Sequence, residues 1–251
     1  MQIHEHGKDA SDHVIEDSKH PRRSWRPHNR RHTMSMLKTL FRAARKDTKD
    51  HPSRVLEHPR DLQPGDIVKF GFAGQQVISN QSLQVQAIDT CDLGGEQHKK
   101  TLFTLQGGEA RLRLAVVDQG QGERLEVGLS VLPEDVEQIF DMDAFIDLLD
   151  PETGTHHVLE RIGEPPHLNG WVGPVYRQEA GQNAYYHIGD YRNRGLPDSE
   201  DDAFSYYLLV SDDRKFGLEV QVHDGGRTDV YLLAYLPISR IEELWPAGNA
   251  S

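Results

Sequence analysis

Two segments of the chain, 102–133 and 206–237, carry the same alternation of apolar and polar residues. At a constant offset of 104 positions, the apolar residues of one segment fall on apolar residues of the other, as Leu112 does on Phe216. An alternation with a period of two is typical of a β-strand that has one buried face. Because the match runs without a gap, it predicts an internal duplication of β structure.

Each segment contains a glycine-rich turn between its two alternating runs. The turns are Gln119–Gly122 and His223–Gly226. Glycine readily adopts the positive φ that a tight hairpin turn needs. Each copy is therefore predicted to be a β-hairpin of two long strands, preceded by another strand at Thr101–Leu105 or Ser205–Val210.

The resemblance between the two copies extends at both ends. Downstream, LPEDVEQIF (132–140) matches LPISRIEELW (236–245), and a proline in the first turn with an apolar stripe predicts a short helix that closes each copy. Upstream, QSLQVQAIDTCDLG (81–94) aligns with QNAYYHIGDYRNRG (182–195). Each repeat is thus expected to contain strand, loop, strand, hairpin and short helix.

The predicted fold is mainly β with short helices. Two tandem hairpin or meander repeats would pack as a sandwich of two sheets, or as paired small barrels, with pseudo-two-fold symmetry. The expected organisation is a disordered basic tail at 1–33, a basic amphipathic helix at 34–50, a linker at 51–64, β repeat 1 with its closing helix at 65–150, a connecting loop at 151–168, β repeat 2 with its closing helix at 169–246, and a tail at 247–251.

Charge is unevenly distributed along the chain. Residues 1–60 hold 14 Lys and Arg against 8 Asp and Glu, although the whole chain has a net charge of -12. The acidic body should repel polyanions, so nucleic acid is not an expected partner. The chain shows no apolar run of about 20 residues, no signal-peptide pattern and only one cysteine, Cys91. These features predict a cytoplasmic protein.

The segment MSMLKTLFRAARKDTKD, residues 34–50, has apolar and basic residues on opposite faces of the predicted helix. Such a helix suits a partner's groove, the acidic body of its own chain, or an anionic membrane surface. The residues assigned to this membrane or partner helix are Leu37, Lys38, Leu40, Phe41, Arg42, Arg45 and Lys46.

No catalytic signature is found in the sequence. It contains no phosphate loop and no GxGxxG, GxSxG or HExxH motif, so no catalytic residue and no cofactor is predicted. His156 and His157 with Glu160 could form part of a metal site. Adjacent histidines point to opposite sides of an extended chain, however, and no third ligand is placed, so no metal site is predicted either.

Polar and aromatic residues near the predicted repeat ends form the candidate ligand or partner surface. The alignment places Asp89 opposite Asp190, and these acids either shape their loops as hydrogen-bond acceptors or form a carboxylate pair between the repeats. The full candidate set is Asp89, Asp190, Tyr191, Arg192, Arg194, His187 and His223.

The stretches VQAIDTCDLGG…KKTLFTL and FSYYLLVSDD…GLEVQV resemble the YjfK-like family of bacterial cytoplasmic proteins of unknown function. The resemblance covers residues 62–245, and a start such as MSMLKTLFRAARK also suits it, whereas the basic tail 1–33 departs from it. It implies genomic company with membrane-remodelling proteins of the phage-shock type. No catalytic residue is carried over from it.

These observations predict a non-enzymatic accessory or adaptor protein that binds a protein partner, with the basic helix at 34–46 contacting either a second partner or, peripherally, a membrane surface. The alternative is a small-ligand-binding protein or an enzyme that uses a carboxylate-containing cleft between the two repeats. The identity of the partner and the oligomeric state stay open.

Overall fold

The structure is a computed structural model that describes residues 54–94, 99–120, 122–150, 157–197 and 202–248. The predicted tail at 1–33 and the predicted helix at 34–50 lie outside the described residues, and so do all seven residues assigned to that helix. The described residues belong to one compact unit, Pro52–Ser251.

Within the described residues, eleven strands form a single antiparallel sheet in the order β11-β1-β2-β3-β4-β5-β10-β9-β8-β7-β6. Their bounds are β1 Ile67–Phe70, β2 Ser82–Asp92, β3 Lys99–Gly107, β4 Ala110–Asp118, β5 Glu123–Val131, β6 Val158–Glu160, β7 Val175–His187, β8 Ala203–Ser211, β9 Phe216–His223, β10 Thr228–Pro237 and β11 Ile241–Trp245. The alternating runs thus form strands, and the predicted mainly-β class is confirmed.

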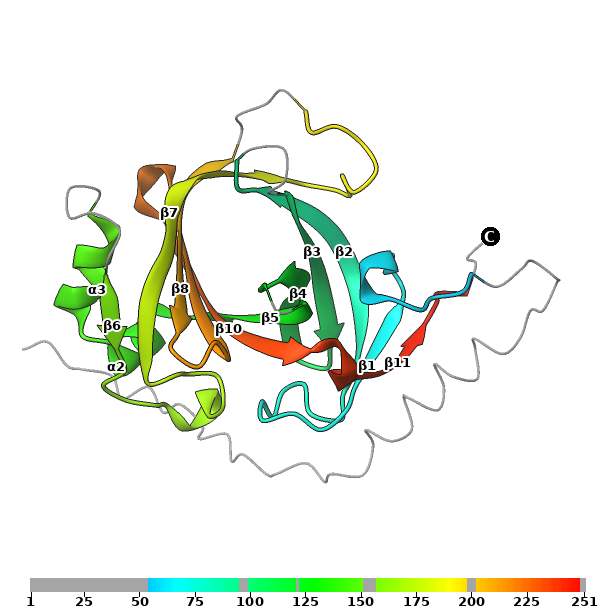
Figure 1. Cartoon of the computed structure of the whole chain (residues 1–251), viewed down its shortest axis with the longest axis horizontal. Coiled ribbons are helices and arrows are strands. Elements are labelled where there is room, and N and C mark those ends of the chain that lie inside the picture. Colours follow the sequence, from blue (N-terminus) through cyan, green and yellow to red (C-terminus); the bar gives the residue numbers. More distant parts are fainter. Residues whose placement is uncertain (1–53, 95–98, 121, 151–156, 198–201, 249–251) are drawn as a thin grey trace, which may run out of the picture. The chain divides into compact units, whose positions relative to one another are not determined.

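The sheet closes on itself. The end of β2 pairs with the end of β7, from Thr90 opposite His187 to Asp92 opposite Tyr185. The strands from β2 through β5 and β10 to β7 therefore form a ring, and β1, β11 and β6 lie outside the closure. Figure 1 looks through this ring, with β2 and β3 on one side and β7 and β8 on the other.

The arrangement differs from the expected sandwich or pair of small barrels. β5 and β10 pair along their length, from Val131 opposite Val230 to Arg124 opposite Pro237. The two halves of the chain are consequently joined by backbone hydrogen bonds at both seams, and not only by contact between apolar faces.

The two faces of the ring strands have different characters. Successive side chains of a strand point to opposite faces. In β4, Leu112 and Leu114 belong to the large apolar core, whereas Arg113 between them points into the ring. The same core cluster includes Leu218 of β9, so the two halves share one core on the outer face of the strands.

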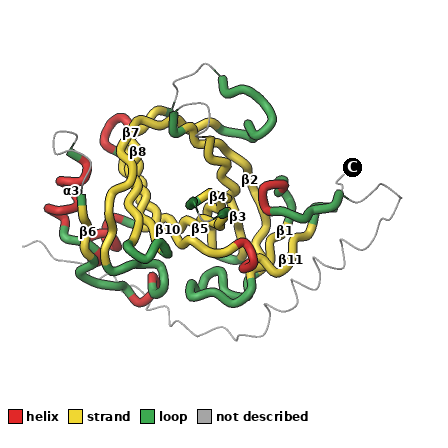
Figure 2. The backbone as a smooth tube through the Cα atoms, viewed as in Figure 1, coloured by secondary structure: helices red, strands yellow, loops and turns green. Residues whose placement is uncertain are grey.

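Two helices follow β5: α2 at Pro133–Ile139 and α3 at Met142–Leu149. Pro133 occupies the first turn of α2, where its missing N–H costs nothing. Asp141 caps α3 by accepting a hydrogen bond from the Ala144 amide at 3.0 Å. Figure 2 shows the helical turns outside the ring. Among the described residues, no helix has the length and apolar composition needed to cross a membrane.

The end of the second half differs from the expected closing helix at 236–245. A single 3₁₀ turn, η4 at Ile238–Arg240, is followed by β11, which pairs with β1 from Ile241 opposite Phe70 to Trp245 opposite Ile67. The reason is tertiary, because β1 presents an edge with which this segment makes a β ladder.

Two segments expected to be connections also contain ordered structure. The predicted linker 51–64 contains the 3₁₀ turn η1 at Pro59–Asp61, and Leu62 is completely buried. The predicted loop 151–168 contains β6 and the 3₁₀ turn η2 at Pro166–Leu168. Both segments pack apolar side chains into the common core, which ties them to the sheet.

Candidate functional site

Four charged side chains lie inside the ring with little exposure to solvent: Lys100, Arg113, Glu126 and Glu219. Lys100 Nζ lies 2.5 Å from Glu126 Oε1 and 2.9 Å from Glu219 Oε2. Arg113 Nη2 lies 2.5 Å from Glu219 Oε1. Two cations and two carboxylates thus form a buried and formally neutral network, which we call the ring network.

Neutral polar groups complete the hydrogen bonding of this network. Gln221 Nε2 donates to Glu219 Oε1 at 2.7 Å, and the Tyr206 hydroxyl lies 3.4 Å from Glu219 Oε2. The Glu219 side chain is only 2% exposed. A buried carboxylate is tolerated when its lone pairs are satisfied by cations and hydrogen-bond donors, as they are here.

The ring network shifts the pKa values of its members. Burial opposes ionisation of Glu219, but Arg113 and Lys100 outweigh it and lower its pKa to about 2. Burial likewise favours the neutral amine of Lys100, but Glu126 and Glu219 outweigh it and raise its pKa well above the ordinary value. Both residues are therefore charged at neutral pH.

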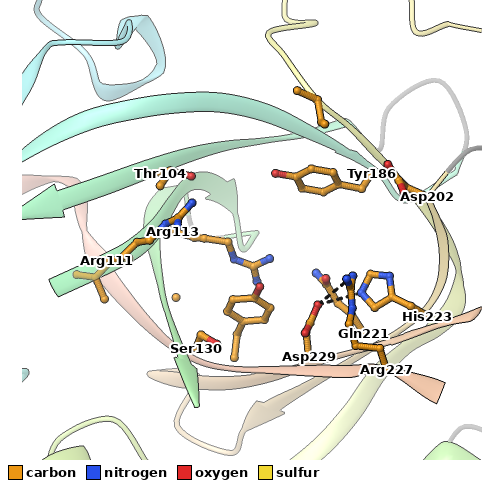
Figure 3. A pocket seen from close by; sticks show the side chains of 14 residues that line it. Thr104, Arg111, Arg113, Ser130, Tyr186, Asp202, Gln221, His223, Arg227 and Asp229 are labelled. Atoms are coloured by element: carbon orange, nitrogen blue, oxygen red, sulfur yellow. Dashed lines mark ion pairs between the residues drawn. The ribbon is translucent and has the colours of Figure 1, made fainter. Parts of the chain in front are cut away.

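A cavity of about 500 Å³ opens beside the ring network. Figure 3 shows its lining, which is mostly polar and aromatic, and Arg113 extends into it from β4. The side chains that matter for its chemistry are Arg111, Arg113, Tyr186, His223, Arg227, Asp229 and Tyr231.

Contacts among the lining residues fix several of these side chains. The Arg113 guanidinium lies 3.2 Å from the ring centroid of Tyr231, a stacked cation–π contact. Asp229 Oδ2 lies 3.1 Å from His223 Nε2, which has no hydrogen-bond partner among the described residues, and 3.4 Å from Arg227 Nη2; both contacts are dashed in Figure 3. The cavity wall is thus preorganised without a ligand.

Farther along the inner face of the ring, apolar side chains pack against one another. Tyr231, Leu233 and Tyr235 share one face of β10 because they are two residues apart. Tyr231 lines the cavity, whereas Leu233 and Tyr235 form an apolar cluster with Val210. Gly217 leaves room for this cluster, because a Cβ there would lie 2.9 Å from the Tyr235 hydroxyl oxygen.

The structure sets His223 apart from the other candidate residues predicted from the sequence. His223 lines the ring cavity. Asp89 accepts hydrogen bonds from the Tyr186 hydroxyl at 2.7 Å and from the Gly189 amide at 2.9 Å. Asp89 therefore holds a cavity-lining tyrosine and the turn after β7, as a loop-shaping acceptor would.

The other candidates cluster around the loop after β7. Asp190 pairs with Arg192 at 2.6 Å, and the Arg194 guanidinium lies 4.0 Å from the ring centroid of Tyr191. His187 is buried, and its ring lies 5.8 Å from that of Tyr191. Tyr191 and Arg192 line a second hollow of about 630 Å³ together with Arg54, Arg60 and Lys99.

Sequence reasoning missed the ring network. Its members occupy the polar positions of strands in which apolar and polar residues alternate, as Glu219 does between Leu218 and Val220. Such a position normally faces solvent, and the pattern does not reveal that the sheet closes and encloses it. The available signal was that Lys100, Arg113, Glu126 and Glu219 all share the polar phase of their strands.

The described residues contain no group of three or more His, Cys, Asp or Glu side chains that could hold a metal ion. Cys91 is buried, and burial raises its pKa to about 12, so its thiol is protonated at neutral pH. Comparison of the chain with protein-family models, with curated proteins and with solved structures gave no match.

Proposed function

We propose that the protein binds a small molecule inside the ring, in the cavity beside Arg113. The observation that carries this proposal is the cavity of about 500 Å³ with a preorganised polar and aromatic wall. Its size falls within the roughly 300–1,000 Å³ typical of ligand sites. Closure of the sheet supports the proposal, because a closed ring holds the wall residues at fixed separations. The cytoplasmic location expected from the sequence remains part of this proposal.

A substitution that fills the cavity tests the proposal. Ser130 lines the cavity from β5 and is exposed, so Ser130→Trp places an indole in the cavity without disturbing the core. Asn183→Trp is the matched control, because Asn183 is an exposed strand residue on the outer face of β7. The measurement is mass spectrometry of small molecules released by denaturing protein purified from its own cells.

A compound retained by the wild type and by Asn183→Trp, but lost from Ser130→Trp, is the expected result. A compound that Ser130→Trp retains equally well would show that the cavity is not its site. If no variant retains a compound, and the wild type also binds none of the small probes named below at 10 mM, the proposal is wrong.

We propose in addition that the ring arose by duplication, with pseudo-two-fold symmetry between its halves. The registers support this. β2 has a bulge between Val85 and Ala87, and β7 has one between Gln178 and Ala180. Asp89 lies three residues after the bulge of β2, and Gln182 lies three residues after the bulge of β7. When the bulges are aligned, Asp89 therefore corresponds to Gln182, and not to Asp190 as in the sequence alignment.

The exchanged ends of the two halves also support duplication. Ile241, at the start of β11, pairs with Phe70 of β1. Phe140, which follows α2, bridges to Arg161, which follows β6. In each half, a residue that follows the fifth strand and its helical turn thus pairs at or next to the first strand of the other half.

A second candidate function is the adaptor role, which the outer edge of the sheet favours. Among the described strands, β11 pairs only with β1, so it lies at an edge of the sheet, where a partner strand could add to the sheet. The test compares the partners recovered from cells by the full chain and by a chain starting at Asp47. A defined partner that requires residues 1–46 supports the adaptor and its basic helix. Identical recovery by both chains removes that helix from the proposal.

A further inference from the structure

We infer that the ring cavity takes a small molecule bearing an oxyanion, a carboxylate or a phosphate, that binds between Arg113 and Arg111. This inference rests on the proposed function and adds the chemical class of the ligand. It is carried by the hydrogen-bonding groups that the cavity leaves uncommitted.

Two of the charged side chains in the cavity wall that have hydrogen-bonding groups unused by the described residues are arginines, which are hydrogen-bond donors. Arg113 uses Nη2 for Glu219, but its buried Nε has no hydrogen-bond partner among the described residues. A buried N–H without an acceptor is unfavourable, so a small shift of the Arg113 side chain that brings Nε to an acceptor atom in the cavity is favoured. Arg111 also lines the cavity and forms no ion pair within the described part of the chain.

The acceptors that could attract a cation are mostly engaged. Asp229 lies within ion-pair distance of both His223 and Arg227. Glu219 is covered by Arg113, Lys100 and Gln221. Asp202 is exposed, as are Arg111 and Arg227, so water screens these three charges more than that of the largely buried Arg113.

The charge of the cavity wall contrasts with that of the rest of the body. Residues 61–251 hold 14 Lys and Arg against 32 Asp and Glu. Nevertheless the cavity wall carries three arginines, Arg111, Arg113 and Arg227, against two acids. A positive wall in a concave site attracts anions more strongly than an exposed surface would.

The stacking of Arg113 on Tyr231 adds a geometric preference. A guanidinium held flat against an aromatic ring presents its N–H groups at its edge, and a planar edge suits the oxygens of a carboxylate or phosphate.

A matched probe series tests the inference. The probes are benzoate, neutral benzamide, cationic benzamidine and inorganic phosphate, titrated into the full chain by isothermal calorimetry at low and high salt. Three variants are compared with the wild type. Arg111→Gln removes one donor, and Arg113→Lys keeps the charge beside Glu219 but removes Nε. Lys215→Gln removes the same charge from an exposed site outside the cavity.

We expect benzoate and phosphate to bind and benzamidine not to bind. Arg111→Gln and Arg113→Lys should each lower the affinity for benzoate about tenfold, because one charge-assisted hydrogen bond is lost. Lys215→Gln should bind benzoate and phosphate as the wild type does, and added salt should lower the affinity for both anions.

The outcomes separate the inference from the proposed function. If benzamide or benzamidine binds as tightly as benzoate, and Ser130→Trp abolishes that binding, the oxyanion inference is wrong and the cavity remains a ligand site. If benzoate binds but Arg111→Gln and Arg113→Lys leave its affinity unchanged, these arginines are not its anchor and the inference is overturned. If no probe binds at 10 mM, the inference fails, and the retained-compound measurement decides the proposed function.

Discussion

Arg113 of β4 donates a hydrogen bond to Glu219 of β9 at 2.5 Å across the inside of the ring. The two strands are not neighbours in the sheet, because β5 and β10 lie between them. A side-chain contact of this kind exists only when the sheet is strongly curved. The position of Arg113 in the cavity wall therefore depends on the curvature that closes the ring.

Removing one member of the ring network should destabilise the fold strongly. Glu219→Leu leaves Arg113 without its carboxylate and Lys100 with Glu126 alone, so the free energy of unfolding should fall by about 3–5 kcal/mol. Urea unfolding followed by circular dichroism measures this. Asp212→Asn breaks an exposed pair with Arg177 and should change nothing measurable.

Replacing both partners should be less damaging than replacing one. The double variant Arg113→Leu with Glu219→Leu leaves no unpaired arginine, so it should regain part of the stability that Glu219→Leu loses. Additive losses in the two single variants and the double variant would show that the two side chains do not interact.

Acid should weaken the fold through Glu219. Its pKa is about 2 in the folded protein, against an ordinary value of 4.5, so between these values the unfolded chain binds more protons. The stabilisation from Glu219 is thus fully present above about pH 4.5 and is lost as pH falls towards 2. Urea unfolding across this range should show the stability difference between wild type and Glu219→Gln shrinking. A difference independent of pH would contradict the assignment.

Cys91 should react slowly with thiol reagents in the folded protein. Burial raises its pKa from 9.0 to about 12, which lowers the thiolate fraction at neutral pH by about a thousandfold. The measurement is the rate of disulfide exchange with a chromogenic reagent, with the same protein in urea as the control. Equal rates in the two states would mean that the thiol is accessible.

Gly170 should resist substitution. Its φ is +81°, and a Cβ there would lie 2.7 Å from the carbonyl oxygen of Gly74. Gly170→Ala should therefore lower the melting temperature by several degrees, since about 1 kcal/mol or more is lost. Gly74→Ala is the control at the same contact, because a Cβ on Gly74 meets nothing within 4 Å. Similar melting temperatures for the two variants would contradict the close approach.

The two halves should remain together when the chain is cut between them. A protease site inserted between Asp150 and His157 separates β1–β5 from β6–β11, yet three strand pairings join these parts: β5 with β10, β2 with β7, and β1 with β11. Size-exclusion chromatography of the cut protein should give one peak at the uncut position. Two separate peaks would show that the seams do not hold the halves without the covalent link.

The sequence predicted the local β structure because alternation is a local property. The runs around Leu112 and Leu218 required only a pattern of apolar and polar residues, and the turn at Gln119–Gly122 required only glycine. The mainly-β class follows from these local signals. The ring cavity did not follow from these signals, since only His223 among the predicted candidate residues lines it.

Tertiary structure decided what alternation leaves open. The pattern gives Glu219 and Arg113 a face, but whether that face meets water or the inside of a ring depends on the pairing of β2 with β7. Likewise, residues 241–245 carry an apolar stripe that suits a helix, and the edge of β1 makes them a strand. Both outcomes depend on partners far away in the chain. The sequence by itself therefore determined the long strands such as β4 and β9, whereas long-range backbone pairing made 241–245 a strand and determined what the ring strands enclose.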